Sequence, residues 1–188
     1  MTRTLLCILL PLILARPALA AGPANLSAEA RRGEKLVALG GCNDCHTPFK
    51  MGPDGLVPDM SRMLSGHTER IEIPTSSRLP TVWLWIGAES RTAFTGPWGV
   101  SYATNLTPDR ETGLGEWTEQ EFVTAMRTGK HRGSGRPILP PMSWGTPTRR
   151  TDAEVRAIWA YLRRIPPIRN EVPSPRSAEP PPGVAQGK

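Results

Sequence analysis

The chain has 188 residues, a length that suits one domain and leaves little room for two. Proline (21 residues) and glycine (18 residues) are frequent enough to argue against a long helical bundle or a coiled coil. The formal net charge of +6 is compatible with a nucleic-acid partner, but charge alone is weak evidence for one. No apolar run reaches the roughly 18 residues that span a bilayer, so we do not expect an integral membrane protein.

The first 20 residues have the pattern of a Sec-type signal peptide. Arg3 precedes an apolar run from 5 to 15, and Ala18-Leu19-Ala20 supplies the small residues that signal peptidase reads. A short membrane anchor is the alternative, but the run is brief and Pro11 interrupts it. A lipoprotein would use Cys7, which lies inside the run. The sequence therefore predicts cleavage after Ala20, export to the periplasm, and no integral membrane segment after signal removal.

Export changes the charge and the cysteine count. Loss of Arg3 and Arg16 lowers the net charge from +6 to +4, and loss of Cys7 leaves only Cys42 and Cys45. Two nearby thiols in an oxidising compartment are expected either to form a disulfide or to be ligated.

Capping signals and apolar periodicity predict three helices, over 28–39, 119–128 and 152–164. Glycines end the first two, and Pro166-Pro167 ends the third. In the third helix, apolar residues recur at the spacing of one helical face. The predicted capping residues are Ser27, Thr118 with Glu121, and Thr151 with Glu154.

The remaining sequence is rich in proline and glycine. The stretch 47–115 allows short strands at 81–86 and 99–104, and its length indicates that a cofactor organises it. Five prolines after 172 predict a disordered or polyproline tail. The predicted organisation is a signal peptide at 1–20, an extension at 21–26, one mostly α domain with long irregular loops at 27–170, and a Pro-rich disordered tail at 171–188.

The segment Cys42-Asn43-Asp44-Cys45-His46 has the Cys-x-x-Cys-His spacing of c-type haem attachment. In a short helical turn, both thiols can bond the vinyl groups of one porphyrin edge, and the histidine that follows can reach the iron. The motif predicts one covalently bound haem c, attached through Cys42 and Cys45, with His46 as an axial ligand.

The motif has three possible roles other than haem attachment. A thioredoxin-type redox pair would need a neighbouring βαβ pattern, which the sequence lacks. A Cys₂His₂ zinc site would have to recruit His67 or His131, at spacings that match no zinc finger. A structural disulfide between Cys42 and Cys45 would close so short a loop that it would stabilise little.

The second axial ligand is predicted to be Met142. It follows Pro140-Pro141, and the two prolines stiffen the loop that would present the thioether. Packing of Met142 in the core is the alternative. Met126 is expected in the core. His67 and His131 are the alternative ligands, and their polar, glycine-flanked sequence places both in exposed loops. The methionines that follow the haem motif closely are Met51, Met60 and Met63.

These motifs resemble a class I type, single-haem bacterial periplasmic cytochrome c. The resemblance to the cytochrome subunits of alcohol and sugar-acid dehydrogenases rests on the haem motif and on four further segments, 105–109, 113–118, 127–130 and 139–142. Those subunits often carry several haems, whereas this chain has one Cys-x-x-Cys-His. The resemblance implies a cytochrome c-like haem domain over 27–170, and the surplus length falls mostly in 66–103.

The resemblance also implies contacts within the domain. The two end helices should cross where Gly33 meets Tyr161. The second ring N–H of His46 should donate a hydrogen bond to a backbone carbonyl, and the 52–58 stretch is a candidate to supply that carbonyl. The resemblance makes Asn105 and Trp144 candidates for holding the haem propionates, with ordinary loop capping and packing as the alternative.

The predicted function is one-electron transfer in the periplasm without enzyme activity of its own. A haem subunit docked on a dehydrogenase is one alternative, and an open-site haem enzyme or sensor is another if Met142 does not bind. The partner is predicted to be a redox protein, such as a dehydrogenase or terminal oxidase, and nucleic acid is not expected. An acidic docking surface on that partner is predicted from basic residues that surround Met142 with no acid among them: Arg127, Lys130, Arg132, Arg136, Arg149 and Arg150.

Overall fold

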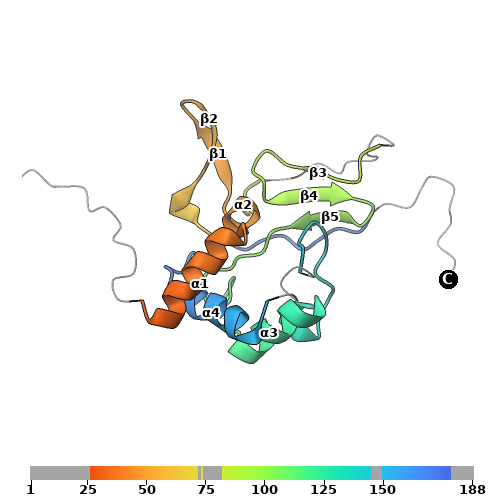
Figure 1. Cartoon of the computed structure of the whole chain (residues 1–188). Coiled ribbons are helices and arrows are strands. Elements are labelled where there is room, and N and C mark those ends of the chain that lie inside the picture. The colour runs from red at the N-terminus through yellow and green to blue at the C-terminus, as the bar shows by residue number, and fades with distance from the viewer. Residues whose placement is uncertain (1–25, 72, 74–81, 145–149, 179–188) are drawn as a thin grey trace, which may run out of the picture.

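The structure is a computed structural model, and it describes residues 26–71, 73, 82–144 and 150–178. The predicted signal peptide and the tail from 179 onward lie outside these residues. Within them, the helices are α1 (Ala28–Leu39), α2 (Cys42–His46), α3 (Glu119–Thr128) and α4 (Asp152–Leu162). The helices predicted at 28–39 and 119–128 are confirmed, and the third ends two residues before its predicted end (Figure 1).

The predicted caps account for the helix boundaries. Thr118 and Thr151 each accept a bond from a backbone N–H in the first turn, and Glu121 and Glu154 close the two capping boxes. At the end of α3, Gly129 takes a left-handed conformation (φ 66°) that disfavours other residues.

Helices α1 and α4 cross at a contact that only glycine allows. A Cβ atom on Gly33 would stand 2.5 Å from the carbonyl carbon of Ala157 and 3.0 Å from Cβ of Tyr161. The crossing that the resemblance implied, Gly33 against Tyr161, is therefore present. It brings Val37 of α1 into the same apolar core as Ile158 and Leu162 of α4.

Strands also contribute to the fold, so the expectation of a mostly α domain is not confirmed. The described strands are β1 (Phe49–Gly52), β2 (Gly55–Pro58), β3 (Ile86–Gly87), β4 (Ala93–Gly96) and β5 (Gly99–Tyr102). They form an antiparallel hairpin, β1–β2, and an antiparallel sheet in the order β3–β4–β5 (Figure 1). The 3₁₀ turns in the described residues are η1 (Met60–Arg62) and η2 (His131–Gly133).

The sheet differs from the strand predictions in detail. The predicted strand at 99–104 corresponds to β5. Of the strand predicted at 81–86, residue 81 lies outside the described residues and 82–85 are not strand, because pairing with β4 begins only at Ile86.

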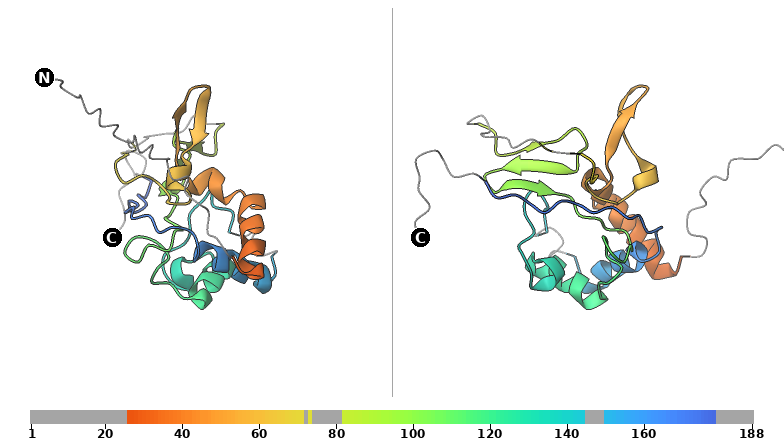
Figure 2. Two further views of the ribbon diagram at one scale, coloured as in Figure 1. Left: turned by 90° about the vertical axis from the view of Figure 1, so that its left-hand side faces the viewer. Right: turned by 180° about the vertical axis from the view of Figure 1, so that it is seen from behind.

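The chain after α4 runs back to the sheet. Arg176 and Val100 of β5 exchange two backbone hydrogen bonds, of 2.8 and 3.0 Å, and Figure 2 shows this blue segment alongside β5. Residues 171–178, which the sequence placed in a disordered tail, are therefore bound to the domain.

Candidate haem site

A cavity of about 770 Å³ lies between the sheet, the helices and the loop that precedes α4. Cys42, Cys45, His46 and Met142 all line it, so the structure brings the four predicted site residues to one place. The volume falls within the range of small-molecule and cofactor pockets. Apolar side chains from α3, α4 and β4 form much of the remaining wall, among them Phe122, Ile158, Leu162 and Phe94.

The imidazole of His46 is held by a backbone carbonyl. Its Nδ1 lies 2.8 Å from the oxygen of Thr104, directly after β5. A carbonyl only accepts, so Nδ1 carries the proton and Nε2 has a free lone pair for a metal. The expectation that 52–58 supplies this carbonyl was wrong, because that stretch forms the β1–β2 hairpin instead. Burial lowers the pKa of His46, which favours the neutral, ligating ring.

A loop after η1 fixes the backbone of the motif. The N–H of Gly66 donates to the carbonyl of His46 at 2.8 Å, and the N–H of Leu64 donates to the hydroxyl of Thr47 at 2.9 Å. Gly66 has φ 78°, and a Cβ there would stand 2.5 Å from the oxygen of Ala103. The glycine thus allows the 103–104 backbone, which holds the His46 ring, to lie against this loop.

The two cysteines are unpaired thiols at the cavity wall. Burial is the main cause that raises the pKa of both Cys42 and Cys45. A thioredoxin-type redox cysteine needs a lowered pKa instead, and the β3–β4–β5 sheet is antiparallel, without the parallel strands of a βαβ unit. Among the described residues, no three His, Cys, Asp or Glu side chains are grouped so that they could hold a metal, which disfavours the zinc interpretation.

The loop that carries Met142 is anchored at several points. The hydroxyl of Ser101 in β5 donates to the carbonyl of Pro140 at 2.6 Å. The N–H of Ile138 donates to the carbonyl of Gly129 at 2.7 Å, at the end of α3. Met142 is itself 37% exposed, so its thioether is not packed in the core. These bonds present Met142 at the cavity from a loop that β5 and α3 both restrain.

The two other histidines have surroundings that sequence reasoning did not predict. His67 was expected in an exposed loop, but it has no exposed surface. Its Nε2 lies 2.9 Å from the oxygen of Ile71 and its Nδ1 lies 2.9 Å from the hydroxyl of Thr92, so both ring nitrogens are engaged. His131 is half-buried, lines the cavity, and contacts the ring of Trp117 edge-on. The remaining methionines lie at different depths: Met51 and Met60 are exposed, whereas Met63 and Met126 pack against the core.

The two residues proposed for the haem propionates have structural partners. Asn105 donates to the carbonyl of Ile168 at 2.7 Å and accepts from the N–H of Thr107, so its amide joins two loops. The ring of Trp144 packs against Gly129. These contacts favour the alternative of ordinary loop capping and packing. The cationic residues that do line the cavity are Arg136, Arg150 and Arg169, of which the third pairs with Glu111.

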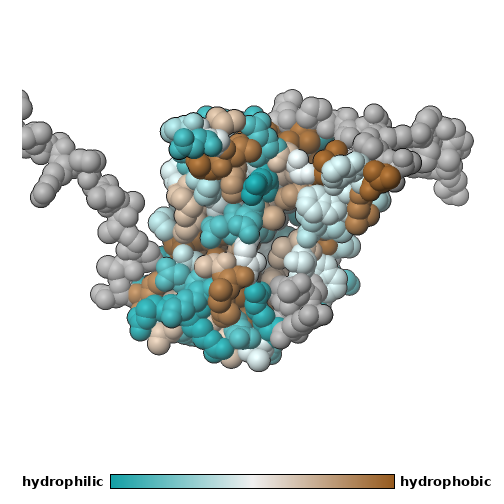
Figure 3. Space-filling view, turned by 45° about the horizontal axis from the view of Figure 1, so that its top comes forward, coloured by the Kyte–Doolittle hydropathy of each residue, from teal (hydrophilic) through white to brown (hydrophobic). Residues whose placement is uncertain are grey.

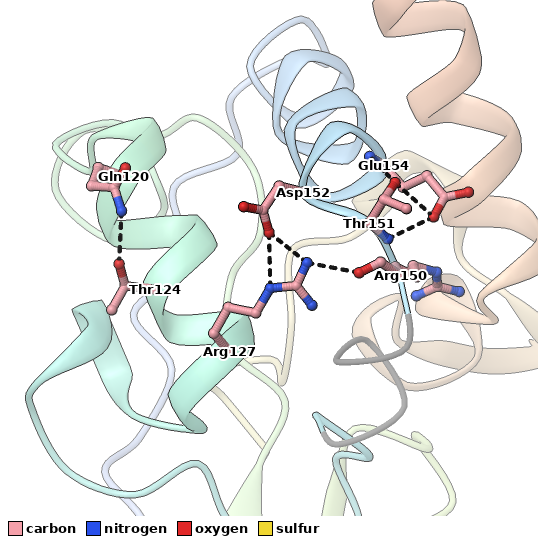
Figure 4. Close-up of polar contacts among 7 residues, drawn as sticks. All are labelled: Gln120, Thr124, Arg127, Arg150, Thr151, Asp152 and Glu154. Carbon is pink, nitrogen blue, oxygen red and sulfur yellow. Dashed lines mark hydrogen bonds and ion pairs between the residues drawn. The ribbon is translucent and has the colours of Figure 1, made fainter.

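Acidic residues compensate part of the predicted basic surface. Arg127 donates to Asp152 and to the carbonyl of Arg150, which joins α3 to the start of α4 (Figure 4). Arg132 lies 3.6 Å from Glu121. Within the described chain, no carboxylate lies within 4.0 Å of the charged groups of Lys130, Arg136 and Arg150. Arg149 lies outside the described residues.

No family model matches the chain. Similar proteins include one subunit of the nicotinate dehydrogenase of Pseudomonas putida, which is 41% identical over 42% of this chain and 6% of that protein. The fructose dehydrogenase cytochrome subunit of Gluconobacter japonicus is 34% identical over 47% of this chain and 18% of that subunit. A dihaem cytochrome c-type protein of Cereibacter sphaeroides is 28% identical over 77% of this chain and 38% of that protein.

The chain spans well under half the length of the relatives that it matches. Several of them are cytochrome subunits of dehydrogenases, which supports a cytochrome-type fold for this chain. Among the described helices, none combines the length and the apolar character that a bilayer crossing requires.

Proposed function

We propose that this protein is a single-haem, class I type cytochrome c that transfers one electron at a time in the periplasm. The observation that carries the proposal is the convergence of Cys42, Cys45, His46 and Met142 on one cavity, although Met142 is 96 residues away from His46 in sequence. The similarity to cytochrome subunits of dehydrogenases supports haem-based electron transfer in general.

The residues present fit a haem group. Cys42 and Cys45 would form the thioether links, and His46, with its Nδ1 bound to Thr104, would offer Nε2 to the iron. Met142 would supply the second axial ligand from its restrained loop. When bound, haem supplies reversible one-electron chemistry between ferric and ferrous iron. The chain itself supplies the ligands and fixes their orientation, and the apolar wall lowers the access of water to the site.

Because His46 and Met142 would both hold the iron, no ligand position would remain for a substrate, and we propose no enzyme activity for the chain alone. The domain boundaries proposed from the sequence are compatible with this function: a signal peptide at 1–20, the cytochrome domain from 27 and a Pro-rich tail. A second candidate is a haem subunit docked on a dehydrogenase, which the names of the relatives favour. In either case the partner is a redox protein.

Met142→Ala in the haem-loaded protein tests the ligand assignment. The wild type should be low-spin when oxidised and should show the weak near-infrared band of sulfur–iron ligation. The variant should lose that band, and its reduced form should bind carbon monoxide readily. Met51→Ala and Met60→Ala, two exposed methionines, should behave as the wild type does. Immediate carbon monoxide binding by the wild type would instead favour an open-site haem enzyme or sensor.

A further inference from the structure

Five successive apolar side chains beside the sheet are exposed to solvent, and we refer to them as the 82–86 patch. Figure 3 shows hydrophobic residues, in brown, next to the grey atoms on the side of the molecule where the sheet lies. A contiguous exposed apolar patch on a monomer is often functional. The exposed fractions are 89% for Val82, 61% for Trp83, 68% for Leu84, 41% for Trp85 and 42% for Ile86.

The patch is connected to the wall of the cavity through one aromatic contact. The rings of Trp85 and Phe94 meet edge-on, with their centroids 5.6 Å apart. Gly87 pairs with Phe94 across β3 and β4, and a Cβ on Gly87 would stand 3.3 Å from the Phe94 ring. Phe94 also lines the cavity. A protein bound at the patch would therefore lie close to the proposed haem.

We propose that the 82–86 patch is the docking surface for an electron-exchanging protein, held by uncharged apolar contacts. This proposal rests on the proposed function. Tryptophan is the side chain most enriched among the residues that dominate binding energy at protein interfaces, and the patch has two. From Val82 to Ala88 the sequence contains no charged residue, so the patch suits an equally uncharged area on the partner.

The size and charge of the patch favour an electron-exchanging protein over a second copy of the chain and over a lipid surface. Its exposed area is on the order of 500 Å², given the area that large side chains bury. A stable dimer needs about 800 Å² from each copy, whereas electron-transfer encounters bury less than about 1,200 Å² in total. Recognition of an anionic lipid surface would need lysine or arginine among the apolar residues, and the segment from Val82 to Ala88 has neither.

The experiment compares haem-loaded wild type with Trp83→Ser/Leu84→Ser. Each is mixed with the combined membrane and periplasmic fractions of the source organism, from a strain that lacks its own copy of this gene. Reduction of the haem is followed by absorbance. We expect at least about a tenfold slower second-order reduction, the size of effect that follows loss of a central interface residue. The haem spectrum and the thermal unfolding should be unchanged.

Met51→Ser/Met60→Ser is the matched control, because it removes two equally exposed apolar side chains elsewhere, and its rate should equal that of the wild type. Equal rates for the patch variant and the wild type would overturn the docking surface and leave the proposed function intact. A wild type that the fractions do not reduce at all would contradict the proposed function, and the docking surface with it. If the double variant has an altered spectrum, Val82→Ser, at the most exposed position, replaces it in the same measurement.

Two further measurements separate the other occupants. If the protein binds vesicles of phosphatidylcholine with phosphatidylglycerol and the patch variant does not, the patch contacts a lipid surface, and the proposal of a protein partner is overturned. If the wild type sediments as a dimer and Trp83→Ser/Leu84→Ser sediments as a monomer, the patch binds a second copy of the chain, and the proposal of a different protein partner is overturned. We expect neither vesicle binding nor a dimer.

Discussion

Ser101 connects the sheet to the loop of the proposed methionine ligand. Its hydroxyl accepts from the indole N–H of Trp98 at 3.2 Å and donates to the carbonyl of Pro140 at 2.6 Å. The side chain is buried, so loss of the hydroxyl would leave two groups without this partner. Ser101 is therefore a positioning residue for Met142, which it does not need to touch.

Ser101→Ala should weaken methionine ligation more than it weakens the fold. We expect a loss of about 1–2 kcal/mol of stability, the cost of a broken buried hydrogen bond. In a denaturant titration, the sulfur–iron band of the haem-loaded variant should disappear before the helical circular dichroism does. Ser143 is an exposed residue of the same loop. In Ser143→Ala, the sulfur–iron band and the helical circular dichroism should disappear at the same denaturant concentration. A band that vanishes only with the helices would show that Ser101 acts through global stability alone.

The residues of this site differ in how well the sequence predicts their positions and partners. Cys42, Cys45 and His46 belong to one short motif, so spacing alone predicts their role as haem-attachment residues. The carbonyl of Thr104 lies 58 residues from His46, and a backbone acceptor has no side-chain signature. His67 was misjudged because its polar, glycine-flanked sequence is typical of a loop, whereas its hydrogen bonds allow it to be buried.

At the scale of elements, the crossing of α1 and α4 determines how the haem motif is presented. α1 leads through Gly40-Gly41 directly into α2, so the position of α1 against α4 fixes where the cysteines lie. That contact depends on the absence of a side chain at Gly33, beneath Ala157 and Tyr161.

Gly33→Ala should separate the two helices. The added methyl group would collide with the backbone carbonyl of Ala157, which no rotamer change can relieve. We expect the haem-loaded protein to lose about 3 kcal/mol, the upper range for an overpacked core. Lys35→Ala, at an exposed position on α1, should cost little, since alanine is the best helix former. Thermal unfolding followed at the haem band measures both changes, and a variant as stable as Lys35→Ala would contradict the close crossing.

The helices could be predicted from the sequence more completely than the strands. Helices α1, α3 and α4 have caps and a repeating apolar face, which are local signals. The β1–β2 hairpin was missed although Gly52-Pro53-Asp54-Gly55 is a turn sequence that could have indicated it. The strand predicted at 81–86 overlaps β3 only at Ile86, because β3 is two residues long and is defined by its pairing with β4.

At the scale of the whole molecule, the cavity supports the prediction that a cofactor organises the long loops. The cavity borders the main apolar core through Phe122, Ile158 and Leu162. Much of the cavity wall is apolar, and covering apolar surface that would otherwise face water contributes roughly 25 cal/mol per Å². A bound haem would fill that volume with apolar surface.

The charge distribution predicts a second, salt-dependent contribution to partner binding. Pairing with Asp152 and Glu121 reduces the effect of Arg127 and Arg132. Among the described residues of this surface, Lys130, Arg136 and Arg150 are left as charges that an acidic partner would meet. Arg136 lines the cavity, so attraction there would orient the proposed haem toward the partner.

Lys130→Glu/Arg136→Glu should slow haem reduction by the organism's fractions about tenfold at low salt, since electrostatic steering changes association rates by at least that much. The wild-type rate should fall as salt rises, because screening acts over about 10 Å at 0.1 M. Arg31→Glu/Lys35→Glu on α1 changes the net charge equally and should have a smaller effect. The haem spectra should not change. A wild-type rate that is insensitive to salt, with equal rates in both charge variants, would remove steering from this surface and leave the 82–86 patch as the sole proposed docking contact.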